Sequence, residues 1–165
     1  MTAQIAENLL YQGEQVAMCT NPLSDYFAAG GFNPRFECNC TALWRGYIGS
    51  WEIVADRLYL VGLEGTLEDG TEATLGTVFP NFPERVFAHW YSGTLRVPQG
   101  RQLEYVHMGY GSRFERDVFL DIERGVVVNT QVRQNGVAQS NDAPEGYSVG
   151  AMTLFPRSRG GSKAQ

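Results

Sequence analysis

Five residues with polar ring side chains are close to one another in the sequence, in the second half of the chain: His89, Tyr91, Tyr105, His107 and Tyr110. These two histidines are the only ones in the sequence. Imidazole changes its charge near neutral pH, so a histidine pair among phenols can transfer protons, or bind a polar ligand by stacking and hydrogen bonding. The structural alternative is a packed aromatic face whose polar tips bond to the backbone.

A hairpin is predicted to bring four of these rings together. Its strands would be 88–97 and 101–109, joined by a three-residue loop at Pro98-Gln99-Gly100. This register places four rings on one face: His89, Tyr91, Tyr105 and His107. Glu104 would point to the other face, and two histidines without a carboxylate make a poor metal site. We therefore expect neither a metal nor a cofactor.

A second candidate lies on an earlier predicted hairpin, which turns at Ile48-Gly49 and places Arg45 opposite Glu52. On a wet surface such an ion pair contributes about 0–1 kcal/mol. Framed by Tyr47 and other apolar side chains, Arg45 could instead be a polar anchor inside an aromatic-lined pocket. A purely structural ion pair is the alternative interpretation.

Apolar residues indicate how these strands face the core. A turn at Asp56-Arg57 gathers one apolar face from Trp44, Trp51, Ile53, Leu58 and Leu60. The opposite face, with Tyr59 and Val61, is also apolar, which is typical of a sheet that is covered on both sides or lines a cavity. Farther along, strands Phe114–Ile122 and Val126–Arg133 bring their apolar sets onto one face if the loop between them has three residues, 123–125.

Turn signals every 8–12 residues predict about ten strands in a largely antiparallel barrel or sandwich, an all-β fold. One short helix is expected, with Asn21 as cap, Pro22 at its first position, Leu23–Ala29 as its body and Gly30-Gly31 as its end. No helix between strands is long enough for a parallel crossover. Residues 1–155 form the predicted single domain and 156–165 a flexible tail.

The charge balance narrows the class of partner. The chain has 13 Lys+Arg against 18 Asp+Glu, a net charge of −5, whereas binding to nucleic acid or an anionic membrane needs a basic surface. There is no visible secretory signal and no apolar run of about 18 residues, so a cytoplasmic protein is expected. The three cysteines are Cys19, Cys38 and Cys40. The one-residue spacing of the last two, with no second Cys/His pair, indicates reduced thiols rather than a metal site.

Three motifs occur in order along the chain: LWRGYIGSWEI at 43–53, WYSGTLRVPQG at 90–100 and YVHMGYGS at 105–112. With them the sequence resembles a family of small uncharacterised bacterial proteins over roughly residues 9–132. The resemblance implies a bacterial, cytosolic, single-domain protein and assigns no catalytic residue.

Two functions are consistent with the sequence. The first is a binding module that holds a small polar or sugar-like ligand, or a partner protein in the manner of an immunity protein or inhibitor, on an aromatic face. The second is a small barrel enzyme in which His89 and His107 act as acid and base. The candidate ligand-binding residues are His89, Tyr91, Tyr105, His107, Tyr110, Arg45 and Glu52.

Overall fold

The computed structural model describes residues 3–38, 40–106 and 109–137. Within them the strands are β1 (Glu7–Tyr11), β2 (Glu14–Met18), β3 (Tyr47–Val54), β4 (Arg57–Gly65), β5 (Val86–Phe87), β6 (Gly93–Glu104), β7 (Arg113–Glu123) and β8 (Val126–Gln134). The helices are α1 (Pro22–Ala28) and α2 (Leu75–Val78). The all-β class is confirmed.

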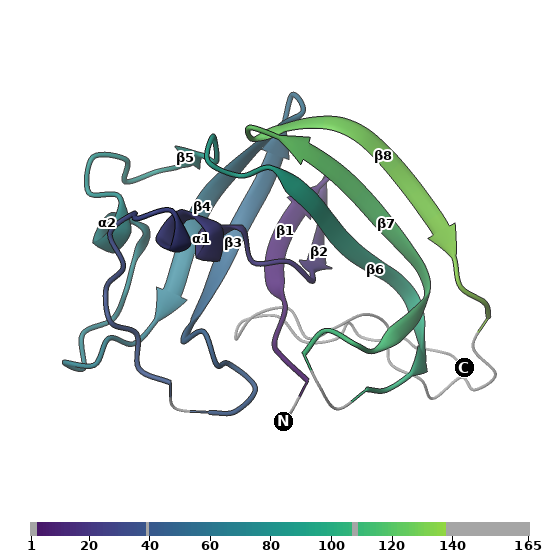
Figure 1. The fold of residues 1–165 in the computed structure, drawn as a ribbon, viewed down its shortest axis with the longest axis horizontal. Helices are drawn as coiled ribbons and strands as arrows, with labels where there is room; N and C mark the ends of the chain where they lie inside the picture. Colours follow the sequence, from purple (N-terminus) through teal and green to yellow (C-terminus); the bar gives the residue numbers. More distant parts are fainter. Residues whose placement is uncertain (1–2, 39, 107–108, 138–165) are drawn as a thin grey trace.

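All eight strands belong to one sheet, with the order β2-β1-β3-β4-β8-β7-β6 and with β5 paired to β4. Neighbouring strands are antiparallel except β1 and β3, which run parallel. The sheet is strongly bent, so that β6, β7 and β8 curve away from β3 and β4, and both helices lie beside β3 and β4 (Figure 1). This bend gives the single sheet the two opposed layers of a sandwich.

The two ends of the strand order approach each other without forming a continuous ladder. The amide of Cys19, which directly follows β2, donates to the carbonyl of Arg96 in β6 over 2.8 Å. The amide of Arg96 in turn donates to Oγ1 of Thr20 over 3.0 Å. Within the described residues, these two hydrogen bonds connect the ends of the sheet, but the sheet is not closed into a barrel.

The main core lies between the layers, and most of the predicted core residues belong to it. Trp51, Leu58 and Leu60 are buried in it, and Ile53 is partly buried and packs against this core. Trp44 is the exception, because its side chain is 52% exposed. It lies in the loop before β3, where its amide donates to Oε1 of Gln4, so it is not a residue of the sheet and the prediction for Trp44 was wrong.

The predicted turn at Ile48-Gly49 does not exist, because β3 runs without interruption from Tyr47 to Val54. The next turn was predicted at Asp56-Arg57, but it forms one residue earlier, at Ala55-Asp56, where both residues have positive φ, and Arg57 already pairs with Val54. It pairs Ile53 with Leu58 across β3 and β4. Gly49 lies inside this strand, opposite Leu63 of β4, and its amide donates to the Glu7 carboxylate.

The hairpin of β7 and β8 has a shorter turn than the sequence predicted. Arg124 and Gly125 form a two-residue turn with φ of 50° and 83°, which fits the twist of a tight hairpin. A bulge between Asp121 and Ile122 then shifts the register by one residue. Leu120 consequently lies opposite Thr130, so the two predicted sets share one face over this stretch. The predicted three-residue loop was wrong, however. Val126 lies opposite Glu123 and so leaves that face, and Val128 and Val132 are 58% and 55% exposed.

The predicted hairpin at Pro98-Gln99-Gly100 is wrong. Residues 98–100 lie inside the 12-residue strand β6, which pairs with β7 and not with a strand at 101–109. Gly100 has a φ of 82° and occupies a bulge between Gln99 and Gln102, where glycine removes the strain of this conformation. Pro98 is tolerated because β6 is the last strand in the order and one of its edges is unpaired in the ladder.

Helix α1 confirms the predicted helix within one residue at its end, and Asn21 occupies the N-cap position. The Asn21 side chain does not cap the helix, however, because its Oδ1 accepts a hydrogen bond from Tyr110. The second helix, α2, was not predicted. In the part of the chain described here, no helix has the length and apolar character needed to cross a membrane.

Candidate functional site

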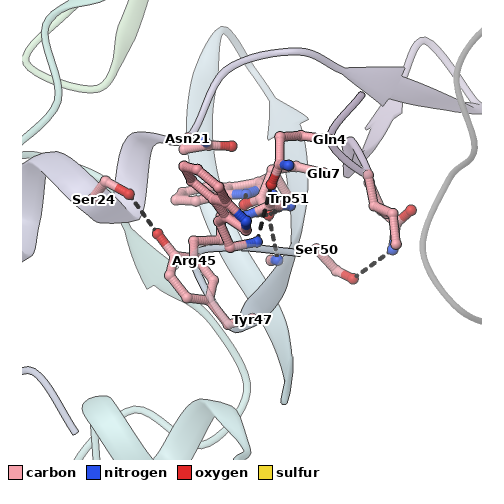
Figure 2. A network of polar contacts seen from close by, with 12 residues as sticks. Gln4, Glu7, Asn21, Ser24, Arg45, Tyr47, Ser50 and Trp51 are labelled. Carbon is pink, nitrogen blue, oxygen red and sulfur yellow. Dashed lines mark hydrogen bonds and ion pairs between the residues drawn. The ribbon is translucent and has the colours of Figure 1, made fainter. Parts of the chain in front are cut away.

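The most deeply buried acidic side chain is Glu7, at the start of β1, and its carboxylate accepts four hydrogen bonds. Oε2 accepts from Nε and Nη2 of Arg45, at 3.1 and 2.7 Å, and from the amide of Gly49 at 2.8 Å. Oε1 accepts from Nε1 of Trp51 at 2.9 Å. Figure 2 shows Arg45 and Trp51 converging on this carboxylate. A charge with no exposed surface is thus fully paired, as burial requires.

The parallel pairing of β1 and β3 places Glu7 beside Gly49 and Trp51. Leu9 is in register with Trp51, so Glu7 lies next to the preceding residues of β3. A Cβ atom on residue 49 would lie 2.5 Å from Oε1 of Glu7 and 2.8 Å from Nε1 of Trp51. Only glycine therefore allows the carboxylate to reach both the backbone and the indole at this position.

Burial and charge act in opposite directions on this ion pair. Burial raises the pKa of Glu7 above its ordinary value, while Arg45 and the N–H donors of Gly49 and Trp51 limit the rise. For Arg45, burial is the largest influence and disfavours the charged form, but the charge and hydrogen bonds of Glu7, together with Tyr110 and Tyr47, outweigh it and the pKa of the guanidinium is raised. The arginine therefore stays charged, and its charge is balanced locally by Glu7.

The loop that precedes β3 is held against the segment before β1, and this positions Arg45 next to Glu7. The amide of Ile5 donates to the carbonyl of Ala42 over 2.8 Å, and the Gln4 side chain bonds both Thr41 and Trp44. Residues 4 and 5 directly precede β1, so the same segment that carries Glu7 holds the loop that carries Arg45. The guanidinium also lies over the Tyr47 ring, 5.5 Å from its centroid.

Arg45 forms part of the wall of an open hollow of about 430 Å³. The other residues that line it are Asn33, Pro34, Arg35, Phe36 and Glu68. The Arg45 side chain is only 9% exposed. Its Nε and Nη2 are both engaged by Glu7, whereas Nη1 has no hydrogen-bond partner among the described residues and is not sealed from solvent. The hollow is therefore the place beside Arg45 where a ligand can enter, and Nη1 is the guanidinium nitrogen that no described residue engages.

Two short segments form the rest of the wall and are tied together by the backbone. The amide of Glu37 donates to the carbonyl of Thr66 over 2.7 Å, and the amide of Glu68 donates to the carbonyl of Arg35 over 2.9 Å. Phe36 anchors this wall to the core by packing on Tyr47, with ring centroids 5.1 Å apart. Gly46 permits the approach, because a Cβ atom there would lie 2.6 Å from Cβ of Phe36.

Of the residues predicted for the site, the structure brings Arg45 and Tyr110 together. Burial raises the pKa of Tyr110, and the charges of Arg45 and Glu7 act on the same phenol. Its hydroxyl donates to Oδ1 of Asn21 at 2.8 Å. Glu52 is not part of this group. It lies opposite Tyr59 on β4, so the predicted ion pair between Arg45 and Glu52 was wrong, and Glu7 takes the place of Glu52.

The predicted face of histidines and tyrosines does not form among the described residues. His89 and Tyr91 lie before the start of β6, whereas Tyr105 follows its end. His89 is exposed and touches Trp90 edge-on, Tyr91 is buried, and Tyr105 is 54% exposed. His107 lies outside the described residues. Without the hairpin at 98–100, His89, Tyr91 and Tyr105 do not share one strand pair.

Sequence reasoning missed Glu7 and the five wall residues other than Arg45: Asn33, Pro34, Arg35, Phe36 and Glu68. One signal for Glu7 was present, because alternation in β1 puts this acid on the same face as the fully buried Leu9. An acid in the apolar register of a strand requires a buried partner. The wall residues gave no such signal, since they lie in loops and meet only through tertiary contacts.

No family model, curated protein or solved structure matches this chain. The resemblance to a bacterial family and the cytoplasmic location therefore stay predictions. In the described part of the chain, no group of three His, Cys, Asp or Glu side chains is arranged to hold a metal ion. Cys38 and Cys40 are exposed, and Cys19 is buried.

Proposed function

We propose that this protein is a binding module that holds a small polar ligand in the hollow formed by residues 33–36, Arg45 and Glu68. The observation that carries the proposal concerns Arg45, a nearly buried arginine. Its Nε and Nη2 are fixed by Glu7, and its Nη1 has no hydrogen-bond partner among the described residues. The volume of about 430 Å³ is within the usual range for small-molecule sites.

A fixed arginine is a better anchor than a mobile one. Immobilising a long side chain on binding costs about 0.5–1.5 kcal/mol, and the bonds from Arg45 to Glu7 have already imposed that order in the free protein. Hydrogen bonds from a charged donor are also stronger than neutral ones. A ligand acceptor placed against Nη1 therefore gains a charged hydrogen bond without having to order the arginine.

A ligand-observed NMR screen tests the proposal with D-glucose, D-glucuronate, L-lactate, L-serine and glycerol as probes. Asn33→Trp would fill the hollow from its exposed wall and should abolish binding of any probe that the wild type binds. Glu14→Trp places the same side chain on β2, away from the hollow, and should leave binding unchanged. Binding that survives Asn33→Trp, or no binding by any probe, would contradict the proposal.

A further inference from the structure

The polar groups of the hollow differ in what they can recognise. The residues that line it include two arginines, Arg35 and Arg45, one acid, Glu68, and one amide, Asn33. Arg35, Asn33 and Glu68 make no side-chain hydrogen bond or ion pair within the described part of the chain. The wall thus presents these groups unpaired to whatever enters.

The two arginines favour a carboxylate. A guanidinium matches the two oxygens of a carboxylate through parallel N–H donors. Glu7 already balances the charge of Arg45, so Arg45 contributes directed donors, while Arg35 contributes a positive charge that forms no ion pair within the described residues. One carboxylate placed between them would satisfy both groups.

Glu68 sets a limit to the negative charge of the ligand. A carboxylate in the wall repels a second anionic group, because like charges in one site disfavour each other. It accepts hydrogen bonds from hydroxyl groups, however, and the Asn33 amide can donate to the same groups or accept from them. Phe36 and Pro34 add apolar surface against which the carbon framework of a ligand can lie.

We propose, on the basis of the function proposed above, that the ligand is a small hydroxylated compound with a single carboxylate, of the class of acidic sugars. Its carboxylate lies against Arg45 and Arg35, and its hydroxyl groups lie against Glu68 and Asn33. This assignment distinguishes it from neutral sugars, which lack the group that the arginines recognise, and from dicarboxylates, which Glu68 repels.

Isothermal titration calorimetry with D-glucuronate and D-glucose tests this assignment, because the two molecules differ only in a carboxylate in place of a hydroxymethyl group. We expect D-glucuronate to bind at least tenfold more tightly than D-glucose. Arg35→Gln should weaken D-glucuronate binding about tenfold, which corresponds to a loss of about 1.4 kcal/mol in binding free energy. The same variant should leave D-glucose binding unchanged. Glu14→Gln, outside the hollow, is the matched control and should change neither.

The possible failures are distinguishable. If D-glucose binds as tightly as D-glucuronate, or if another probe of the screen binds in the hollow and D-glucuronate does not, the ligand class is wrong while the binding function stands. If Arg35→Gln leaves D-glucuronate binding unchanged, the role of the arginines is wrong. If no probe binds to the wild type, both the ligand class and the proposed function fail.

Discussion

Glu7 and Arg45 are 38 residues apart in the sequence, yet Nη2 of the arginine lies 2.7 Å from Oε2 of the glutamate. The carboxylate has no exposed surface, and the arginine side chain is almost covered. This contact joins β1 to the loop that precedes β3, and Arg45 is also one of the residues that line the hollow. Both the stability of the fold and the proposed binding of a ligand therefore depend on it.

Removing one member of this pair should destabilise the protein strongly. Glu7→Gln or Arg45→Met leaves a buried charge without its partner, which costs about 3–5 kcal/mol. The double variant removes both charges, so it should lose less than the sum of the single variants, with a coupling energy of about 1–3 kcal/mol. The free energies of unfolding in urea measure this cycle.

The exposed pair of Arg113 and Glu104 supplies the matched control. Its atoms are 3.4 Å apart and both side chains are more than half exposed, so the same cycle there should give a coupling of about 0–1 kcal/mol. Equal coupling energies in the two cycles would mean that burial of Glu7 does not determine the strength of its ion pair.

Much of the fold follows from local patterns, and the site does not. The alternation of apolar residues gave the buried positions Trp51, Leu58 and Leu60 and the facing of β7, because one face of a strand must enter the core. The pairing of Glu7 with Arg45 depends on β1 lying parallel to β3 across a connection that contains β2 and α1. No periodicity in the sequence encodes that placement.

The error at Pro98-Gln99-Gly100 has a specific physical cause. Proline and glycine in succession are typical of a loop, but the same residues fit a bulge inside the edge strand β6. Local sequence cannot separate the two, because the choice depends on whether β6 pairs with residues 101–109 or with β7. The candidate face of His89, Tyr91, Tyr105 and His107 depended on that choice.

Glycine is required at position 49 for a steric reason, which a single substitution can test. In Gly49→Ala the new methyl group would lie 2.5 Å from the Glu7 carboxylate, so the carboxylate or the indole of Trp51 must move. We expect a loss of about 1–3 kcal/mol, as for overpacking of a core, measured by urea unfolding.

Gly62→Ala, on the neighbouring strand β4, serves as its control. There the nearest atom is Cβ of Ser50 at 3.4 Å, which is an ordinary contact. This variant should lose clearly less stability than Gly49→Ala, and a loss as large as that of Gly49→Ala would show that the contact with Glu7 is not the cause.

Stability should fall at alkaline pH because of two buried tyrosines. Burial, helped by nearby carboxylates, raises the pKa of Tyr47 and of Tyr91 to about 12, whereas an unfolded tyrosine titrates near pH 10. The stabilisation is complete below pH 10 and is lost as the pH rises from there towards 12. Urea unfolding between pH 8 and pH 11.5 should show this loss, and Tyr47→Phe should make it smaller. A flat profile above pH 10 would refute it.

The three thiols should differ in reactivity. Cys38 and Cys40 are exposed, while Cys19 is buried and burial strongly raises the pKa of its thiol. Ellman's reagent should therefore modify two thiols in the native protein and the third only in denaturant. The variant Cys38→Ser/Cys40→Ser should keep the wild-type melting temperature and remove the fast reaction. Rapid modification of Cys19 in that variant would contradict its burial.

The state of Arg45 upon binding tests the central claim most directly. In ¹H–¹⁵N NMR spectra that resolve arginine side chains, Nε–H of Arg45 reports the bond to Glu7, and the Nη1 protons report the nitrogen that Glu7 does not engage. Titration with D-glucuronate, or with the tightest probe of the screen if D-glucuronate does not bind, should shift and slow the exchange of the Nη1 protons. The Nε–H signal should remain hydrogen-bonded, and backbone shifts should concentrate at residues 33–36 and 68. Saturation of the protein without any change at Arg45 would contradict the account.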